Sequence, residues 1–369
     1  MLQNTSTPRI FIAATRQNDG KTTTSVGLYS CLKKKFRRVG YIKPVGQRFV
    51  EINGKKIDED TVLINQTYQP GLPLEAMSPI AVDPWFTRYY LDQGDPAELV
   101  GRVQQAFNRA AWEQDFVLIE GSGHAGVGSV FNMSNAQVAS ILHSRVIIVS
   151  RGGVGRPLDE ISLNLALFEK HDVEVVGVVL NQVHEDKMDS LRQYAERGLN
   201  RMGLELLGVL PMEKELRKAT FNQICSELEG RWLTGQEHHR RRRVDKVVIA
   251  TSSPANVGVH IEPGVLLVTA GDREDLLMEL VVKCREKPEW NEIAGVVLTL
   301  GFMPGEAVLK ELRLLNFPVL LVEWDSFAVA TLINRMTVKT EPGDHDKIEI
   351  IQKMVDKYVD VDRIVEAAG

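Results

Sequence analysis

Residues 14–23 read Ala-Thr-Arg-Gln-Asn-Asp-Gly-Lys-Thr-Thr, and they stand between a short apolar run and a stretch with helical spacing. A buried strand that turns directly into a helix directs the N–H groups of the turn and of the helix start toward one place, where they carry partial positive charge. Lys21 can reach the β- and γ-phosphates of a nucleotide, the Thr22 hydroxyl can ligate Mg²⁺, and Gly20 lets the backbone approach the phosphates. The stretch therefore predicts a phosphate-binding loop.

This loop departs from the usual spacing G-x-x-x-x-G-K-[ST], whose first glycine would fall at Thr15. A polar strand-to-helix turn capped by a threonine is the alternative interpretation. We favour the phosphate loop, because Gly-Lys-Thr-Thr directly after a buried strand is uncommon by chance. The loop residues expected to bind a nucleotide are Thr15, Asp19, Gly20, Lys21, Thr22 and Thr23.

The sequence around the loop alternates apolar β-type runs with helical stretches as far as Pro211. The clearest buried strands are expected at 10–14, 116–119, 146–149 and 175–180. Apolar residues at three and four spacing predict helices at 22–35, 97–112, 135–142 and 158–170. Short buried strands joined by such helices are typical of a doubly wound α/β domain with a parallel sheet.

The pattern changes after Pro211, where a polar stretch ends in His-His-Arg-Arg-Arg-Arg. We expect the first domain at residues 1–211, a connecting segment at 212–243, and a second, smaller α/β domain at 244–369. The C-terminal stretch 344–368 is helical and amphipathic, so it is expected to pack on the second domain.

Composition restricts the partners of the chain. Its 369 residues are 44% hydrophobic and 25% charged, which is ordinary for a globular protein with two domains. The net charge of −5 gives no general attraction to nucleic acid or anionic lipid, and no apolar run is long enough to cross a bilayer. The three cysteines are widely spaced and stand apart from histidines, which favours neither disulfides nor zinc. We therefore expect a cytoplasmic protein.

Two acidic residues are candidate metal ligands together with Thr22. Glu120 ends an apolar strand, which is how phosphate-loop proteins place an acid near the metal. Asp60 stands at a predicted helix start, where it would either ligate Mg²⁺ or cap the helix. Lys43 follows another short strand and would add positive charge beside the phosphates if that strand neighbours the first; a solvated lysine is the alternative.

Three other patterns receive weaker interpretations. Residues 121–126 fit G-x-G-x-x-G, but no acid follows between Glu120 and Asp159, so we expect a flexible lid rather than a dinucleotide site. The basic run at 238–243 is interpreted as a solvated linker or helix end. The aromatic residues within 85–90 have helical spacing, and we expect them in the core or in a dimer contact.

Residues 9 to about 211 resemble the dethiobiotin synthetase family, whose phosphate loop carries one residue more between its first glycine and Gly-Lys-Thr. On that register Ala14 replaces the glycine. The resemblance rests on five ordered matches: Gly20-Lys21-Thr22, Lys43-Pro44-Val45, Asp60, Glu120-Gly121-Ser122-Gly123 and Asn181-Gln182-Val183. It implies ATP and Mg²⁺ as cofactors, Lys21 and Lys43 as catalytic lysines, Asn181 on the adenine side, and a homodimer.

From about residue 212 the chain resembles the DRTGG domain, through residues 271–275, 297–301 and 317–321. This pair of domains is similar to the N-terminal, non-catalytic part of long phosphate acetyltransferases, so no acetyltransferase catalytic domain is expected here. The resemblance implies a nucleotide-responsive regulator, which we favour. The alternative is an ATP-dependent ligase or ATPase that activates a small carboxylate, or a carbamate formed from an amine, by phosphorylation. Residues 46–48, Gly-Gln-Arg, lack the family's substrate-binding serine, which weighs against dethiobiotin synthesis itself.

Overall fold

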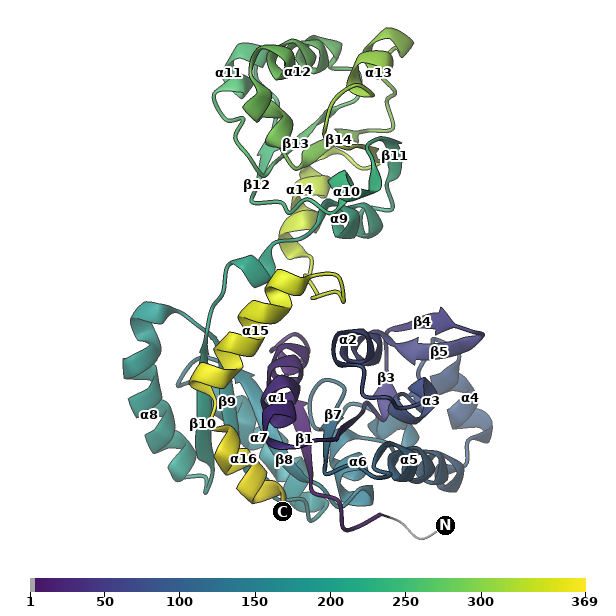
Figure 1. Ribbon diagram of the computed structural model, residues 1–369, viewed down its shortest axis with the longest axis vertical. Coiled ribbons are helices and arrows are strands. Elements are labelled where there is room, and N and C mark those ends of the chain that lie inside the picture. The colour runs from purple at the N-terminus through teal and green to yellow at the C-terminus, as the bar shows by residue number, and fades with distance from the viewer. Residues whose placement is uncertain (1–3) are drawn as a thin grey trace. The chain divides into compact units, whose positions relative to one another are not determined.

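The computed structural model describes residues 4–369 and separates them into two compact units (Figure 1). The first unit contains the chain up to Glu213 together with Thr340–Gly369, and the second contains Lys214–Lys339. In sequence, the second unit is therefore an insertion near the end of the first.

A six-stranded parallel sheet forms the centre of the first unit, in the order β10-β9-β8-β1-β7-β2. Its strands are β1 (Arg9–Ala14), β2 (Val39–Ile42), β7 (Phe116–Glu120), β8 (Arg145–Arg151), β9 (Val175–Val183) and β10 (Glu205–Pro211). Strand β1 lies between β7 and β8, which continue the sheet in opposite directions, so its carboxyl end is a topological switch point. The doubly wound parallel sheet predicted from the sequence is confirmed.

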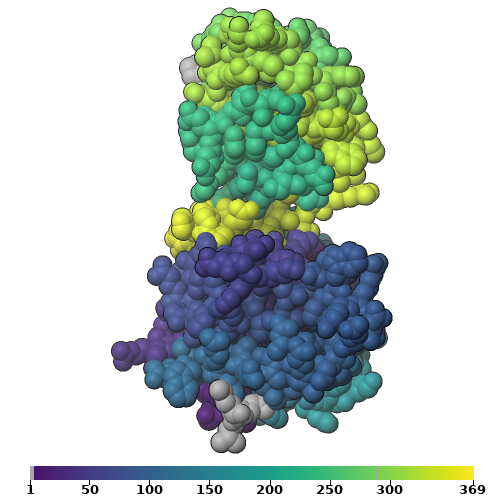
Figure 2. Space-filling model, turned by 90° about the vertical axis from the view of Figure 1, so that its right-hand side faces the viewer, coloured from purple at the N-terminus to yellow at the C-terminus, as the bar shows by residue number. Residues whose placement is uncertain are grey.

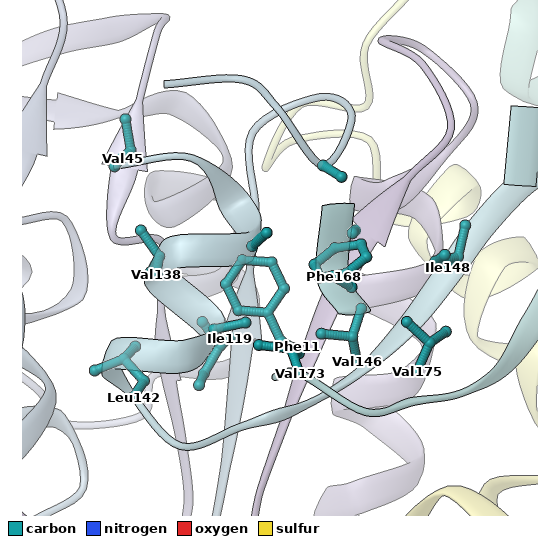
Figure 3. Packing of buried hydrophobic residues seen from close by; sticks show 14 of the residues in the cluster. Phe11, Val45, Ile119, Val138, Leu142, Val146, Ile148, Phe168, Val173 and Val175 are labelled. Atoms are coloured by element: carbon teal, nitrogen blue, oxygen red, sulfur yellow. The ribbon is translucent and has the colours of Figure 1, made fainter. Parts of the chain in front are cut away.

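Helices cover both faces of this sheet (Figure 1). They are α1 (Lys21–Lys35), α2 (Glu59–Tyr68), α3 (Leu74–Met77), α4 (Phe86–Gln93), α5 (Pro96–Ala110), α6 (Asn135–Ile141), α7 (Arg156–Lys170) and α8 (Met188–Asn200). Side chains of a strand alternate between faces. Phe11 of β1 therefore enters the core formed with α5, α6 and α7, where Figure 3 shows it among Ile119, Val146 and Phe168. Ile10 and Ile12 are buried on the opposite face, where α1 contacts the sheet.

Two short β-ribbons extend the sheet region beyond what the sequence pattern predicts. Strands β3 (Val45–Gly46) and β6 (Ile80–Ala81) pair in parallel, and β4 (Phe49–Ile52) forms a hairpin with β5 (Lys55–Asp58). The hairpin turns at Asn53 and Gly54, whose φ angles of 50° and 73° suit the primed turns that match strand twist. The second strand of this hairpin runs directly into α2, and so it determines where the acidic residues before α2 lie.

The C-terminal helices α15 (His345–Tyr358) and α16 (Val361–Ala368) belong to the first unit, whereas the sequence prediction placed them on the second domain. Helix α15 packs along α1, where Lys34 Nζ lies 2.7 Å from Asp356 Oδ1. Figure 2 shows the C-terminal residues, in yellow, against the purple and blue residues of the first unit. Farther along, Arg363 lies 2.5 Å from Glu205. The prediction was open to this error because amphipathic spacing identifies an apolar helix face but not the surface that covers it.

The second unit is a smaller α/β domain, as predicted. Its sheet has the order β11-β15-β14-β13-β12, parallel except for β11. The strands are β11 (Arg231–Thr234), β12 (Lys246–Ile249), β13 (Val265–Ala270), β14 (Gly295–Thr299) and β15 (Val319–Leu321). The helices are α9 (Phe221–Glu227), α10 (Glu237–Arg240), α11 (Pro254–Gly258), α12 (Glu274–Glu286), α13 (Glu306–Leu312) and α14 (Ser326–Arg335). Single 3-10 turns occur at Ser129–Phe131, Glu185–Lys187, Glu215–Arg217 and Pro288–Glu292.

The predicted connecting segment, residues 212–243, is not a linker, because its residues from Lys214 onward are an integral part of this second unit. Strand β11 pairs with β15, and the Arg240 guanidinium lies 4.7 Å from the centre of the Trp232 ring. Arg242 donates to the carbonyls of Asn291 and Ile293 at 2.6 and 2.8 Å. Arg241 also pairs with Glu237 at 3.3 Å, so at least three of the four arginines in the basic run make local contacts.

Among residues 4–369, no helix combines the length and the apolar composition that a bilayer span requires. The three cysteines are buried free thiols. Burial raises the pKa of Cys284 to about 11, so this thiol is protonated near neutral pH and is a poor nucleophile.

Candidate functional site

The loop between β1 and α1 starts with sheet-like backbone hydrogen bonds and ends at the N-terminus of α1, which has no side-chain cap. The amides of Ala14 and Thr15 donate to the carbonyls of Gly123 and Val149 at 3.2 and 3.0 Å. The cap residue of α1 is Gly20, in the left-handed conformation at φ 100°, rather than a threonine. No side chain caps the helix, and its first turn contains no acidic residue. The first amides of α1 are therefore not covered by a capping side chain and face no local carboxylate on their own helix.

Three of the predicted nucleotide-binding residues brace the loop from within. Thr15 Oγ1 donates to Asp19 Oδ2 at 2.7 Å, and Arg151 Nε lies 3.6 Å from Asp19 Oδ1. Asn181 Nδ2, from the end of β9, donates to the Asp19 carbonyl at 2.9 Å. Burial raises the pKa of Asp19, and the Thr15 hydroxyl and Arg151 act against that shift. The Thr15 hydroxyl also lies 2.9 Å from the Ser150 hydroxyl at the end of β8. Together these contacts fix the shape of the loop.

Glu120 lies beside the start of α1, as the sequence prediction requires. The parallel register places Ile12 opposite Glu120, and Thr22 Oγ1 donates to Glu120 Oε1 at 3.0 Å. Tyr41 OH donates to Glu120 Oε2, also at 3.0 Å. Burial raises the pKa of this fully buried carboxyl group. Lys21 is also buried, and burial lowers the pKa of its ammonium although Glu120 acts in the opposite direction.

Lys43 is not a solvated lysine. Its ammonium hydrogen-bonds to Asp60 Oδ2, lies 3.1 Å from Asp58 Oδ1, and lies 3.9 Å from Glu120 Oε1. Burial alone lowers the pKa of Lys43, but the neighbouring carboxylates outweigh it, and the pKa lies above its ordinary value. From the sequence, Lys43 is expected near the phosphates only if its strand neighbours the first strand. That is not the case, because β2 pairs with β7 and not with β1. Lys43 nevertheless reaches the site, because β7 carries Glu120.

Helix α2 is capped by Asp58 and not by Asp60. The Asp58 side chain accepts from the Asp60 amide at 2.9 Å, which leaves the Asp60 carboxylate beside Lys43. Burial raises the pKa of Asp58, and Lys43 opposes that shift. The sequence pattern places Asp58 in an acidic cluster before the helix but singles out neither Asp58 nor Tyr41 as a site residue. The available signal for Tyr41 was its place two residues before Lys43, since alternate residues of a strand share one face.

The oxygen atoms of Thr22, Asp60 and Glu120 are the hard donors that Mg²⁺ prefers. In the described part of the chain, residues 4–369, no group of three or more His, Cys, Asp and Glu side chains is arranged to hold a metal. Mg²⁺ at nucleotide sites keeps several waters and binds phosphate oxygens, so it needs only one or two protein ligands. Thr22, Asp60 and Glu120 therefore suit a Mg²⁺ ion that is also bound by phosphate oxygens better than a Mg²⁺ ion held by protein ligands alone.

The loop after β7 is tied down, in contrast to the flexible lid predicted from its glycines. Asn135 accepts from the Ser122 amide at 2.9 Å and donates to the His124 carbonyl at 2.7 Å. The His124 ring is exposed, and its Nδ1 accepts from the Gly126 amide at 3.2 Å. Thr23, in the first turn of α1, is half-buried. Among the predicted site residues, the structure thus gathers Lys21, Thr22, Lys43, Asp60 and Glu120 into one cluster, with Thr15, Asp19 and Asn181 behind the loop.

Two family descriptions match the chain. Residues 8–220 match a family described as an AAA domain, and residues 223–336 match the DRTGG domain. Phosphate acetyltransferase of Nitrosomonas europaea is 26% identical over 369 residues, covering 97% of this chain and 51% of that protein. The Pseudomonas aeruginosa protein of the same name is 27% identical and covers 97% and 52%. The chain spans about half the length of these relatives.

Solved structures with partial likeness include the MinC:MinD cell division complex of Aquifex aeolicus. It is 16% identical, has a TM-score of 0.37, and covers 57% of this chain and 83% of that chain. Another contains the CBS and DRTGG domains of the regulatory region of Clostridium perfringens pyrophosphatase, complexed with its activator diadenosine tetraphosphate. It is 15% identical, has a TM-score of 0.28, and covers 50% and 89% of the two chains.

Proposed function

The chain belongs to the AAA domain family, and from this premise we propose that it binds ATP with Mg²⁺ at residues 14–23 and acts as a nucleotide-responsive regulator. The uncapped start of α1 is the observation that carries the proposal. Gly20 lacks a side chain there, the first turn contains no acid, and the buried ammonium of Lys21 adjoins it. Backbone amides with one lysine at a helix N-terminus suit the terminal phosphates of a nucleotide.

The roles of the other residues follow from their positions. Thr22, Asp60 and Glu120 would hold Mg²⁺ together with the phosphates, and the ion would neutralise charge on the phosphate oxygens. Lys21 and Lys43 would stabilise charge on the γ-phosphoryl group. Thr15, Asp19 and Asn181 would serve the nucleotide indirectly, because their side chains hold the loop in shape.

A regulatory role is supported by the path of the chain. The second unit occupies residues 214–339, and residues 340–344 link it to α15, which packs along α1. Helix α1 begins at the phosphate loop, so a shift of α1 on nucleotide binding would act on α15 and thus on the segment that leaves the second unit. Relatives named phosphate acetyltransferase match over nearly the whole chain, and we propose that it corresponds to a regulatory region of such an enzyme.

The homodimer expected from the family resemblance also belongs to this proposal. Trp85, Tyr89 and Leu91 on and beside α4 are 72%, 64% and 65% exposed, whereas Phe86 and Tyr90 pack against Phe131. Exposed large apolar side chains of this kind are the surface that a contact between two copies of the chain would bury.

Turnover measurements separate the regulator from an ATP-dependent ligase, which would use the same lysines. With ATP and Mg²⁺ we expect ADP release on the order of 10⁻³ s⁻¹ or slower, as in phosphate-loop proteins without an added arginine. We also expect ATP to change hydrogen exchange in α15 and in residues 214–339. Fast ADP release that requires a small carboxylate or amine, and that Lys21→Ala removes, would favour the ligase. Binding without any change in exchange would contradict the regulatory role.

A further inference from the structure

Lys43 occupies the centre of a cluster of three buried carboxylates. Its side chain is 9% exposed, and those of Asp58, Asp60 and Glu120 are 2%, 10% and 0% exposed. The ammonium contacts Asp60, and it lies 3.1 and 3.9 Å from the nearest oxygens of Asp58 and Glu120. Two of these three acids, Asp60 and Glu120, are proposed above as metal ligands. The Lys43 ammonium therefore occupies the place from which a divalent cation would need to approach the oxygens of Asp60 and Glu120.

We propose that Lys43 is a built-in counter-ion that closes the metal site of the nucleotide-free protein, so that a divalent cation enters only together with a nucleotide. This inference rests on the proposed function, because it concerns the same site. The new element is that the cation and the nucleotide bind together, which a phosphate loop does not by itself require.

Charge explains why the lysine and the cation exclude each other. Lys43 and the neighbouring Lys21 provide two ammonium groups against three carboxylates, so the cluster still attracts cations. Asp60 Oδ2, however, already accepts a hydrogen bond from the Lys43 ammonium. A divalent ion on the same oxygen would lie within a few ångströms of the ammonium, and two cations at that distance repel strongly in a buried site.

A bound nucleotide would supply new hydrogen-bond acceptors for the Lys43 ammonium, so the ammonium could move away from the carboxylates. The Lys43 ammonium has three donors, and phosphate oxygens are strong acceptors for them. The flexible four-carbon stem allows the ammonium to move. The Lys43 backbone stays in place, because its amide donates to the Met77 carbonyl at 2.7 Å. Glu120 is held by Tyr41 and Thr22, and so the carboxylates can keep their positions while the lysine exchanges partners.

Direct measurement of Mn²⁺ binding by electron paramagnetic resonance tests this inference without reference to turnover. In the absence of nucleotide, Lys43→Met in the full chain is expected to bind Mn²⁺ at least about tenfold tighter than the wild type, because the three carboxylates then lose the ammonium that contacts Asp60. Adding Asp60→Asn should reverse that gain. Lys56→Met is the matched control, since Lys56 is exposed and pairs with Asp83 at 2.5 Å on the neighbouring hairpin, and it should leave Mn²⁺ binding unchanged. ATP should increase Mn²⁺ binding by the wild type.

The outcomes for the inference and for the proposed function are distinct. If Lys43→Met gains no Mn²⁺ affinity while the wild type binds ATP with Mg²⁺, the inference is wrong and the proposed function stands. If Lys43→Met gains affinity but the wild type binds no ATP, the proposed function fails together with the joint entry of cation and nucleotide, and only the counter-ion role of Lys43 remains. If Lys43→Met does not fold even with Mn²⁺, the wild type decides: equal Mn²⁺ binding with and without ATP would overturn the inference, and binding that requires ATP would support it.

Discussion

Replacing Gly20 with alanine is expected to weaken ATP binding by at least about a hundredfold, equivalent to roughly 2.7 kcal/mol. Gly20 has φ 100°, where an L-residue is strained, and a Cβ atom built there would lie 1.8 Å from Asn181 Nδ2. Asn181 cannot move freely, because its amide holds the Asp19 carbonyl and accepts from the Gln182 amide. The loop must therefore open at the point where it meets the first turn of α1. Calorimetry with ATP and Mg²⁺ measures the loss.

Gly54→Ala provides the matched control for Gly20→Ala. Gly54 also has a positive φ, 73°, but a Cβ atom there would meet nothing within 4 Å. This variant should lose about 1 kcal/mol of stability from backbone strain and retain its ATP affinity. Equal ATP affinity in the Gly20 variant and the wild type would show that the phosphates do not contact the loop at Gly20.

Gly27→Ala should destabilise the first unit by about 1–2 kcal/mol, even though alanine is the better helix former. A Cβ atom at Gly27 would lie 2.2 Å from Val355 Cγ2 and 3.1 Å from the Ile351 carbonyl oxygen. Helix α15 would therefore have to move away from α1. We expect a lower melting temperature and faster hydrogen exchange in residues 345–358, and a smaller response of the second unit to ATP if α15 transmits it.

The same substitution at Gly101 should have the opposite effect. Gly101 lies within α5, and a Cβ atom there would meet nothing within 4 Å. Gly101→Ala should therefore stabilise the protein by about 0.5–1 kcal/mol through helix propensity and reduced freedom of the unfolded chain. If Gly27→Ala were as stabilising as Gly101→Ala, then α15 would not pack closely on α1, and the proposed route to the second unit would lose its support.

The central part of the fold could be predicted from the sequence because its signals are local. An apolar strand, a glycine-containing turn and a helix that begins with Lys-Thr-Thr follow one another within residues 10–35. The carboxylate of Glu120 could be placed beside them, because carboxyl ends of parallel strands meet at one edge of a sheet. Its hydrogen bond with Thr22 agrees with that reasoning.

The surroundings of Lys43 could not be predicted in the same way. Asp58 reaches the lysine because a two-residue turn at Asn53 and Gly54 folds the hairpin back and delivers Asp58 to the start of α2. That path depends on three-dimensional packing and not on spacing. The position of α15 is a similar case. Its apolar face fits α1 because Gly27 allows close approach, and no single-sequence pattern connects residues so far apart.

Every role proposed for this chain requires that the loop at residues 14–23 binds a nucleotide. Calorimetric titration of the full chain with ATP in the presence of Mg²⁺ tests it, with Lys21→Ala measured in parallel. We expect saturable binding of one nucleotide per chain by the wild type and an affinity at least about a hundredfold weaker for Lys21→Ala, because the charge-assisted contacts to phosphate are lost. No saturable heat from the wild type, or equal affinity in the two proteins, would contradict nucleotide binding by this loop.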